Sequence, residues 1–219
     1  MNALLVVDAQ NGFTELCPNE LPVKGALEIV SEINRIRAMG FINVASGDAH
    51  VPSAPWITTN PELIASDIPG SAGKNYDLYW PAHCMAGTYG SRLIEGLGTP
   101  TDYDYFVWKG VDPGLHPYSC VYHDFSRKMS TGLVEYLRSK DVRNVIVTGL
   151  ALDYCVTSSA LDLTDADFNV ILVYSATRSV APYEAYETFV HSDASEILRR
   201  NGVKIVKDTQ SLSEVLNEK

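Results

Sequence analysis

The 219-residue chain lacks several features that mark particular classes of protein. It contains no run of about 18 apolar residues, so we expect no membrane-spanning helix and no membrane partner. Its start does not combine basic residues with a cleavable apolar segment, so we expect no signal peptide and a cytoplasmic location. Basic residues are outnumbered, and the net charge of -10 argues against nucleic acid or an anionic membrane as a partner.

Cysteine is scarce, and a nucleotide-binding motif is missing. The four cysteines should stay reduced in a cytoplasmic protein, where disulfides are rare. No Gly-x-Gly-x-x-Gly follows the first apolar run, which argues against dinucleotide binding. The sequence shows no internal repeat, low-complexity segment or linker, so we expect residues 1–219 to form a single domain.

Strand-like and helix-like patterns alternate along the chain. We expect strands at residues 3–7, 41–45, 103–108, 144–149, 170–174 and 203–206. Helices are expected at residues 24–39, 131–139, 154–166, 183–201 and 211–217. The spacing of Ser211 and Glu214 predicts a capping box at the start of the last helix. Repeated strand–helix units predict a three-layer α/β/α fold with a mostly parallel sheet of about six strands.

A long irregular segment, residues 49–102, interrupts this alternation and holds most of the prolines. We expect only short helices in it, one of them near residues 91–95. A stretch of this length without clear elements is usually functional. The segment is therefore expected to contribute binding residues.

Three of the predicted strands lead to a reactive side chain. Asp8 follows the first strand, Lys109 follows the third, and Cys155 follows the fourth after a short turn. Because sites in open α/β sheets form outside the carboxyl ends of the strands, we expect these side chains to converge. Cys155 would be the nucleophile, favoured as a thiolate by the start of a helix, but a helix start alone does not ionise a thiol fully.

A nearby base is therefore needed, and Asp8 is the candidate. Lys109 would keep Asp8 ionised and orient it by its charge. The alternative is that Cys155 is a small buried apolar residue and that Asp8 and Lys109 form only a structural ion pair.

A second group of residues suggests a metal site. In an extended segment Asp48 and His50, two residues apart, point the same way, and His83 supplies a second imidazole. Two histidines and one aspartate suit one divalent ion such as zinc, with iron or manganese as alternatives. The remaining histidines have no such neighbours in the sequence and are expected at the surface or in loops: His116, His123 and His191.

Five segments, in their order and spacing, resemble the nicotinamidases of the isochorismatase-like cysteine hydrolase superfamily. They are residues 5–13, 48–50, 80–90, 109–110 and 149–156. The resemblance covers nearly the whole chain and implies the isochorismatase-like hydrolase fold. It also implies that Asp8, Lys109 and Cys155 form the catalytic triad.

The resemblance implies further roles. It makes Asp48, His50 and His83 the metal ligands, and the backbone amides of Ala151 and Cys155 the oxyanion hole. It places a non-proline cis peptide at Leu150–Ala151. The substrate-binding residues that it implies, with two aromatic walls around a pyridine ring, are Phe13, Trp80, Leu150 and Tyr154.

Some positions depart from the pattern of this superfamily. Many relatives have Trp where this chain has Ala49, and a Thr where it has Leu152. Some relatives carry a fourth metal ligand shortly after the second, whereas residues 51–56 offer no strong ligand. The identity of the metal and the number of its water ligands are therefore open.

The sequence thus predicts a metal-dependent nicotinamidase that converts nicotinamide to nicotinate and ammonia through a cysteine thioester. An amidase of the same superfamily for carbamoyl or ureido substrates is the nearest alternative. A protein that binds a small molecule on the same fold without catalysis is a second. An isochorismate-cleaving enzyme is disfavoured, because that chemistry needs no thiol nucleophile. Whether the protein forms a homo-oligomer is left open.

Overall fold

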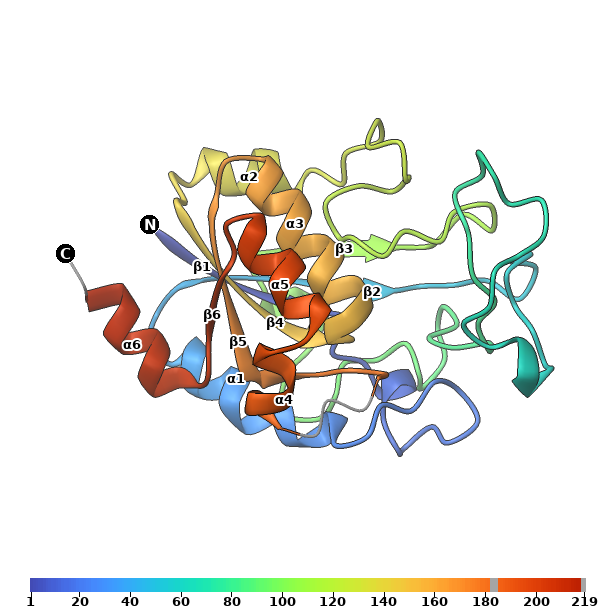
Figure 1. The fold of residues 1–219 in the computed structure, drawn as a ribbon, viewed down its shortest axis with the longest axis horizontal. Coiled ribbons are helices and arrows are strands. Elements are labelled where there is room, and N and C mark those ends of the chain that lie inside the picture. The colour runs from blue at the N-terminus through green and yellow to red at the C-terminus, as the bar shows by residue number, and fades with distance from the viewer. Residues whose placement is uncertain (182–184, 218–219) are drawn as a thin grey trace.

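The computed structural model describes residues 1–181 and 185–217 and shows one six-stranded sheet with helices on both faces (Figure 1). The strands are all parallel, in the order β3-β2-β1-β4-β5-β6. The predicted three-layer α/β/α fold is confirmed. The strands are β1 (Asn2–Val7), β2 (Ile42–Asp48), β3 (Tyr105–Lys109), β4 (Asn144–Leu150), β5 (Asn169–Arg178) and β6 (Lys204–Val206).

Helices cover the sheet in two layers. α1 and α6 pack on one face, and α2, α3 and α5 pack on the other. The helices are α1 (Ile29–Arg37), α2 (Leu133–Ser139), α3 (Thr157–Asp165), α4 (Tyr186–Val190), α5 (Asp193–Arg200) and α6 (Thr209–Asn217). Short 3-10 turns occupy Asn11–Phe13, Ala26–Glu28, Pro61–Leu63 and Pro100–Asp102. In the described residues no helix is long and apolar enough to cross a membrane.

The central strands are buried on both faces, as their continuous apolar runs predict. Along β1, Leu4 and Val6 pack towards α1 and α6, whereas Leu5 and Val7 pack towards α2, α3 and α5. All four are fully buried, which contributes about 1.5–3 kcal/mol for each side chain. This alternation fixes the register of β1 between β2 and β4 and so fixes where its carboxyl end lies.

Several predicted helix boundaries are wrong. The helix expected at residues 183–201 is two helices, α4 and α5, because the Ser192 side chain caps the second by accepting from Ser195 N at 3.3 Å. Residues 183 and 184 lie outside the described part of the chain. The last helix starts at Thr209, and Asp208 caps it by accepting from Ser211 N at 2.9 Å. No helix forms at residues 91–95, where the chain makes turns.

Two other helices begin differently from the prediction. A 3-10 turn over Ala26–Glu28 replaces the first residues of the helix expected at 24–39, and α1 follows it. The helix expected at 154–166 begins earlier, with a wide π-type turn over Leu152–Val156 that runs into α3. That turn carries Cys155.

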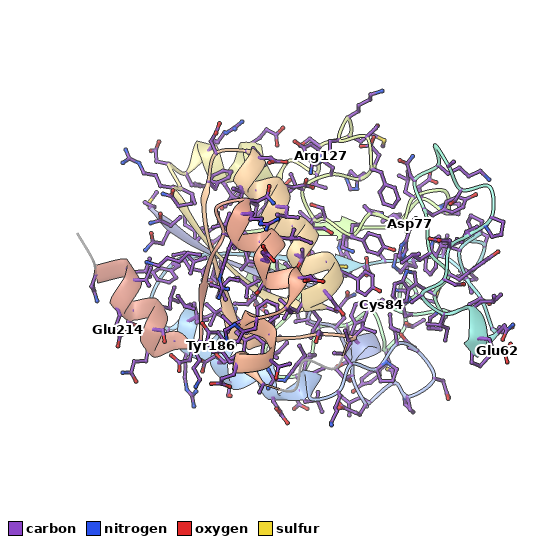
Figure 2. The ribbon with its side chains drawn as sticks, viewed as in Figure 1. Glu62, Asp77, Cys84, Arg127, Tyr186 and Glu214 are labelled. Atoms are coloured by element: carbon purple, nitrogen blue, oxygen red, sulfur yellow. The ribbon has the colours of Figure 1, made fainter. Side chains whose placement is uncertain are left out.

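The strand order places the functional residues at one end of the sheet. The chain moves outward from β1 through β2 and β3 on one side, and from β4 through β5 and β6 on the other. A ligand crevice forms at such a switch point, outside the carboxyl ends of the two central strands. The irregular segment lies beyond these ends, where Figure 2 shows Asp77 and Cys84, far from Glu214 in α6.

Candidate active site

Lys109 lies at the centre of a buried cluster of charged and reactive side chains. Its Nζ atom lies 3.0 Å from Asp8 Oδ2 and 2.6 Å from Asp48 Oδ1. The ammonium also donates to the Pro117 carbonyl at 3.1 Å and lies 3.5 Å from the Cys155 sulfur. The structure therefore brings Asp8, Lys109 and Cys155 together, and it adds Asp48, which was expected only in the metal site.

Strand geometry explains this convergence. Asp48 ends β2 and Lys109 ends β3, and the two are direct register partners, so their side chains point the same way. Asp8 follows β1 with a φ of 42°, a conformation uncommon for a residue other than glycine, which turns the chain out of the sheet. Its carboxylate is held by Ser46 on β2, whose hydroxyl donates to Asp8 Oδ1 at 2.8 Å.

Burial and neighbouring charges make the two carboxyl groups different. Burial raises the pKa of Asp8 to about 6, because desolvation outweighs the attraction of Lys109. The ammonium is near Asp8 Oδ2 but not aligned for a hydrogen bond. For Asp48 burial acts in the same direction, but attraction to Lys109 and His50 outweighs it and holds the pKa of Asp48 well below its usual range. Asp8 is thus the group that can exchange a proton near neutral pH.

The opposite balance holds for Lys109. Burial lowers its pKa, but Asp48 and Asp8 outweigh burial and keep the pKa well above the ordinary value. Lys109 therefore stays a cation, and it cannot serve as the base that takes the thiol proton.

The Cys155 thiol is protonated at rest. Burial raises the pKa of Cys155 well above its ordinary value, the nearby carboxylates raise it further, and only Lys109 opposes them. The start of the helix does not overcome burial, so Cys155 needs a nearby base, as the sequence predicts. The Cys155 sulfur lies within 4.8 Å of a carboxylate oxygen of Asp8, which places the thiol within reach of a base.

Three imidazoles gather beside this cluster. The side-chain nitrogens of His50, His83 and His116 lie within 4.8 Å of one another, and all three residues are buried. His116 lies in a loop, as predicted, but it is buried beside two other imidazoles, so the expectation that it lacks such neighbours is wrong. Asp48 lies at the edge of the group, with Oδ1 3.4 Å from His50 Nε2.

The donor set suits a divalent ion. His83 Nδ1 lies 2.7 Å from the Pro81 carbonyl, an arrangement that leaves Nε2 with the lone pair. Burial lowers the pKa of His83 to about 3 and that of His116 well below its ordinary value, so both rings are neutral. His50 Nε2 and His116 Nδ1 are buried and have no hydrogen-bond partner within residues 1–181 and 185–217. Neutral imidazoles with unpaired nitrogens are the ligands that zinc prefers.

A small cavity of about 20 Å³ joins the two clusters. Its lining includes Lys109 and Asp48 from the first cluster and His83 and His116 from the second. Leu150 does not line it but is fully buried in the core, which disagrees with its predicted contact with substrate. The other predicted pocket residues line the cavity: Phe13, Trp80, Ala151, Tyr154 and Cys155.

The walls of this cavity are aromatic and rigid. Trp80 meets Tyr154 edge to face with ring centroids 4.9 Å apart, and its Nε1 donates to the Tyr118 hydroxyl at 3.2 Å. The peptide bond Leu150–Ala151 is cis, as the resemblance implied. The cavity therefore suits a flat, small ring with a polar group directed at Cys155.

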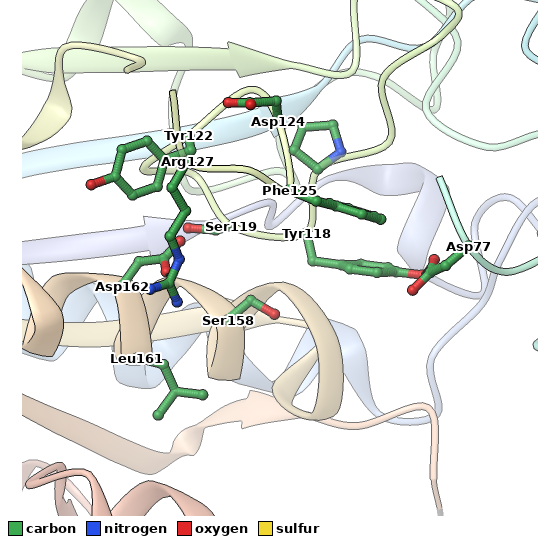
Figure 3. A pocket seen from close by; sticks show the side chains of 11 residues that line it. Asp77, Tyr118, Ser119, Tyr122, Asp124, Phe125, Arg127, Ser158, Leu161 and Asp162 are labelled. Atoms are coloured by element: carbon green, nitrogen blue, oxygen red, sulfur yellow. Dashed lines mark hydrogen bonds and ion pairs between the residues drawn. The ribbon is translucent and has the colours of Figure 1, made fainter. Parts of the chain in front are cut away.

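A second, more open cavity of about 310 Å³ adjoins the first (Figure 3). Tyr118 lines both, and its hydroxyl donates to Asp77 at 2.8 Å. The far side is closed by Arg127, which pairs with Asp162 at 2.6 Å. Tyr118 thus separates the outer cavity from the reactive groups.

Comparison with known proteins places the chain in a family. The fold and the site define a hydrolase with a three-layer α/β/α fold and a candidate nucleophile beyond the central strands. A model of the isochorismatase domain matches residues 2–194, so the chain belongs to the isochorismatase domain family.

Named relatives span most of the chain. The nicotinamidase of Acinetobacter baylyi is 29% identical over 212 residues, which cover 91% of this chain and 93% of that protein. A protein of Arabidopsis thaliana named as a probable inactive nicotinamidase is 25% identical over 185 residues, covering 82% of each chain.

Two solved structures share the fold. The PnC1 protein of L. infantum, in complex with nicotinate, has a TM-score of 0.76 and 27% identity, covering 94% of this chain and 92% of its own. The pyrazinamidase of Pyrococcus horikoshii, in complex with zinc, has a TM-score of 0.70 and 26% identity, covering 94% of this chain and 98% of its own.

Proposed function

We propose that this protein is a metal-dependent nicotinamidase, which hydrolyses nicotinamide to nicotinate and ammonia. The observation that carries the proposal is one small cavity with aromatic walls that is lined by the Cys155 thiol, the Lys109 ammonium and the imidazoles of His83 and His116. The names of the relatives and the nicotinate and zinc in the two similar structures support it. We take zinc as the ion and the cytoplasm as the location.

The proposed chemistry begins with Asp8. Its carboxylate takes the proton of the Cys155 thiol, and the thiolate attacks the amide carbon of the substrate. The backbone amides of Ala151 and Cys155 stabilise the negative oxygen, a contribution of about 2.7–4 kcal/mol for each such donor. Asp8 then returns the proton to the departing ammonia, and water hydrolyses the thioester to give the acid.

Lys109 and the imidazoles have separate tasks in this scheme. Lys109 holds Asp48 ionised and limits the rise in the pKa of Asp8. A bound divalent ion would supply a Lewis-acid position for the pyridine nitrogen, and His50, His83 and Asp48 are the predicted residues that would hold it. Fixing the ring at that end presents the carboxamide to Cys155 at the other.

Two alternative functions fit the structure less well than nicotinamide hydrolysis. An amidase for carbamoyl or ureido substrates does not need imidazoles opposite the thiol, because its substrates have no ring nitrogen. A binding protein without catalysis has a precedent in the Arabidopsis relative named as probably inactive. It does not account for a buried thiol beside a carboxyl group with a pKa of about 6.

A comparison of three amides tests the proposal. Nicotinamide and pyrazinamide each carry a ring nitrogen at the required position, whereas benzamide has nearly the same shape without it. We expect kcat/KM of the zinc-loaded protein to be at least about a hundredfold lower for benzamide, because loss of a strong polar anchor costs roughly 3 kcal/mol. Equal values for benzamide and nicotinamide would favour a general amidase, and turnover of a carbamoyl amino acid alone would favour the first rival.

A further inference from the structure

The loop that follows β3 folds back over the site and carries His116 into it. Lys109 ends β3, and its Nζ donates to the carbonyl of Pro117 at 3.1 Å. The backbone N–H of His116 donates to the Asn75 carbonyl at 2.7 Å, which ties the loop to the irregular segment. These bonds use no imidazole atom, so the ring of His116 is not needed to hold the loop in place.

The imidazole of His116 packs inside the histidine cluster. Its centroid lies 5.2 Å from that of His50 and 6.1 Å from that of His83. Trp56 forms a common wall, with its ring 4.2 Å from His116, 4.6 Å from His50 and 5.4 Å from His83. One ring nitrogen from each of the three residues lies within 4.8 Å of the other two. Nitrogen ligands lie about 2.0–2.1 Å from zinc, and rotation of the side chains would bring all three nitrogens onto one ion.

The unpaired nitrogens point to a ligand. His50 Nε2 and His116 Nδ1 are buried and have no hydrogen-bond partner among the described residues. Buried polar atoms in this condition are unfavourable unless a ligand, an ion or water satisfies them. His83 Nε2 carries the lone pair that can bind the same ion, since the Pro81 carbonyl lies 2.7 Å from Nδ1. One cation satisfies all three imidazoles at once.

Compared with the three imidazoles, Asp48 is less available as a metal ligand, because its carboxylate also pairs with Lys109. Its Oδ1 lies 2.6 Å from the Lys109 ammonium and 3.4 Å from His50 Nε2. The buried ammonium occupies one of the two carboxylate oxygens, so Asp48 is shared between Lys109 and the ion. A further donor from another residue would therefore strengthen the ion's binding.

We propose that His116 is that donor and that the ion is held by the three imidazoles of His50, His83 and His116, with Asp48 at the edge. The inference rests on the proposed metal dependence but not on amide hydrolysis. A set of three imidazoles favours zinc over manganese, which prefers carboxylate oxygens.

Zinc binding without substrate tests the proposal. Metal-free wild type, His116→Phe and His116→Ala are titrated with Zn²⁺ against a chelating dye, with His123→Phe as the matched control. Phe keeps the ring that packs against Trp56 and removes only the nitrogens. Both His116 variants should bind Zn²⁺ at least about tenfold more weakly, because even residues that merely support ligands contribute this much. His123→Phe should bind like the wild type.

Two results would overturn the inference. Wild-type affinity in His116→Phe would mean that the ring serves only to fill space, even if His116→Ala binds weakly. X-ray absorption spectroscopy at the zinc edge gives the number of imidazole ligands in the zinc-bound wild type and needs no variant. Three imidazoles support the inference, and two contradict it. Neither measurement depends on turnover. The inference about His116 can therefore fail while the nicotinamidase proposal holds, and the nicotinamidase proposal can fail while the inference about His116 holds.

Discussion

The Lys109 ammonium forms ion pairs with two carboxylates at the centre of this site, and it affects their pKa values differently. Lys109 lies 2.6 Å from Asp48 and 3.0 Å from Asp8. Asp48 is kept ionised, whereas burial leaves Asp8 with a pKa of about 6. A base for a thiol and an acid for departing ammonia must change protonation near the working pH, and of the two carboxyl groups Asp8 meets this requirement.

Ser46 provides a test of this assignment. Its hydroxyl donates to Asp8 Oδ1 at 2.8 Å and so stabilises the ionised form, which lowers the pKa of Asp8. Since the base is inactive when protonated, kcat/KM should fall as the pH drops below about 6. In Ser46→Ala this acidic limb should move to higher pH by about one pH unit, because a hydrogen bond to a charged group contributes about 1.5–3 kcal/mol.

The control is Ser195→Ala, which removes a fully buried hydroxyl in α5 that donates to the backbone carbonyls of Val190 and Ser192. Its acidic limb should match that of the wild type. If Ser46→Ala leaves the limb in place or moves it to lower pH, then Asp8 is not the group that titrates.

At the residue scale, chemistry at strand ends can be predicted and chemistry in loops cannot. Asp8, Lys109 and Cys155 each follow an apolar run, so their meeting follows from the parallel sheet. Ser46 has a weaker signal, since it lies two residues before Asp48 on β2 and shares its face. His116 has none, because main-chain contacts between distant loops place it, and no local pattern encodes them.

At the scale of elements, the contact between β1 and β4 positions the nucleophile. Gly149 near the end of β4 has a φ of 105°, and a Cβ atom there would lie 1.9 Å from the Val7 carbonyl oxygen. Only glycine allows the strands to approach this closely where the turn to Cys155 begins. The register with β5 also shifts between Val147 and Gly149, which bends β4 at the same point.

Gly149→Ala should therefore destabilise the fold strongly. We expect a loss of about 3 kcal/mol or more in the free energy of unfolding, because the added methyl group meets backbone that cannot move aside. Gly40→Ala is the matched control, since Gly40 also has a positive φ, of 76°, but open space around it. It should lose only about 1–2 kcal/mol from backbone strain. Urea unfolding measures both variants, and equal losses would show that the strand contact is not tight.

The apolar pattern of the sequence predicts which strands form, but it does not predict where every strand and helix ends. All six strands were predictable from apolar runs, but β2 and β5 extend to Asp48 and Arg178, past the end of those runs. The break between α4 and α5 depends on the single side chain of Ser192, which interrupts an otherwise helical pattern. A cap of this kind overrides a pattern that spans many residues.

At the scale of the whole molecule, the site forms where the strand order reverses. Asp8 extends β1, and Cys155 follows β4, its neighbour across the switch point. The irregular segment covers the carboxyl ends of the strands and supplies His83 and Trp80 to the same cavity. The parallel sheet was predictable from the alternation of patterns, whereas the strand order and the path of this segment depend on long-range packing.

The most direct test of the central claim measures ammonia released from nicotinamide by the zinc-loaded wild type and by Cys155→Ala. The variant removes the thiol but keeps Asp8, Lys109 and the imidazoles. We predict that the wild type releases ammonia together with nicotinate and that the variant releases none above the uncatalysed background, because its cavity retains no nucleophile. Comparable release by Cys155→Ala, or no release by the zinc-loaded wild type, would contradict the account.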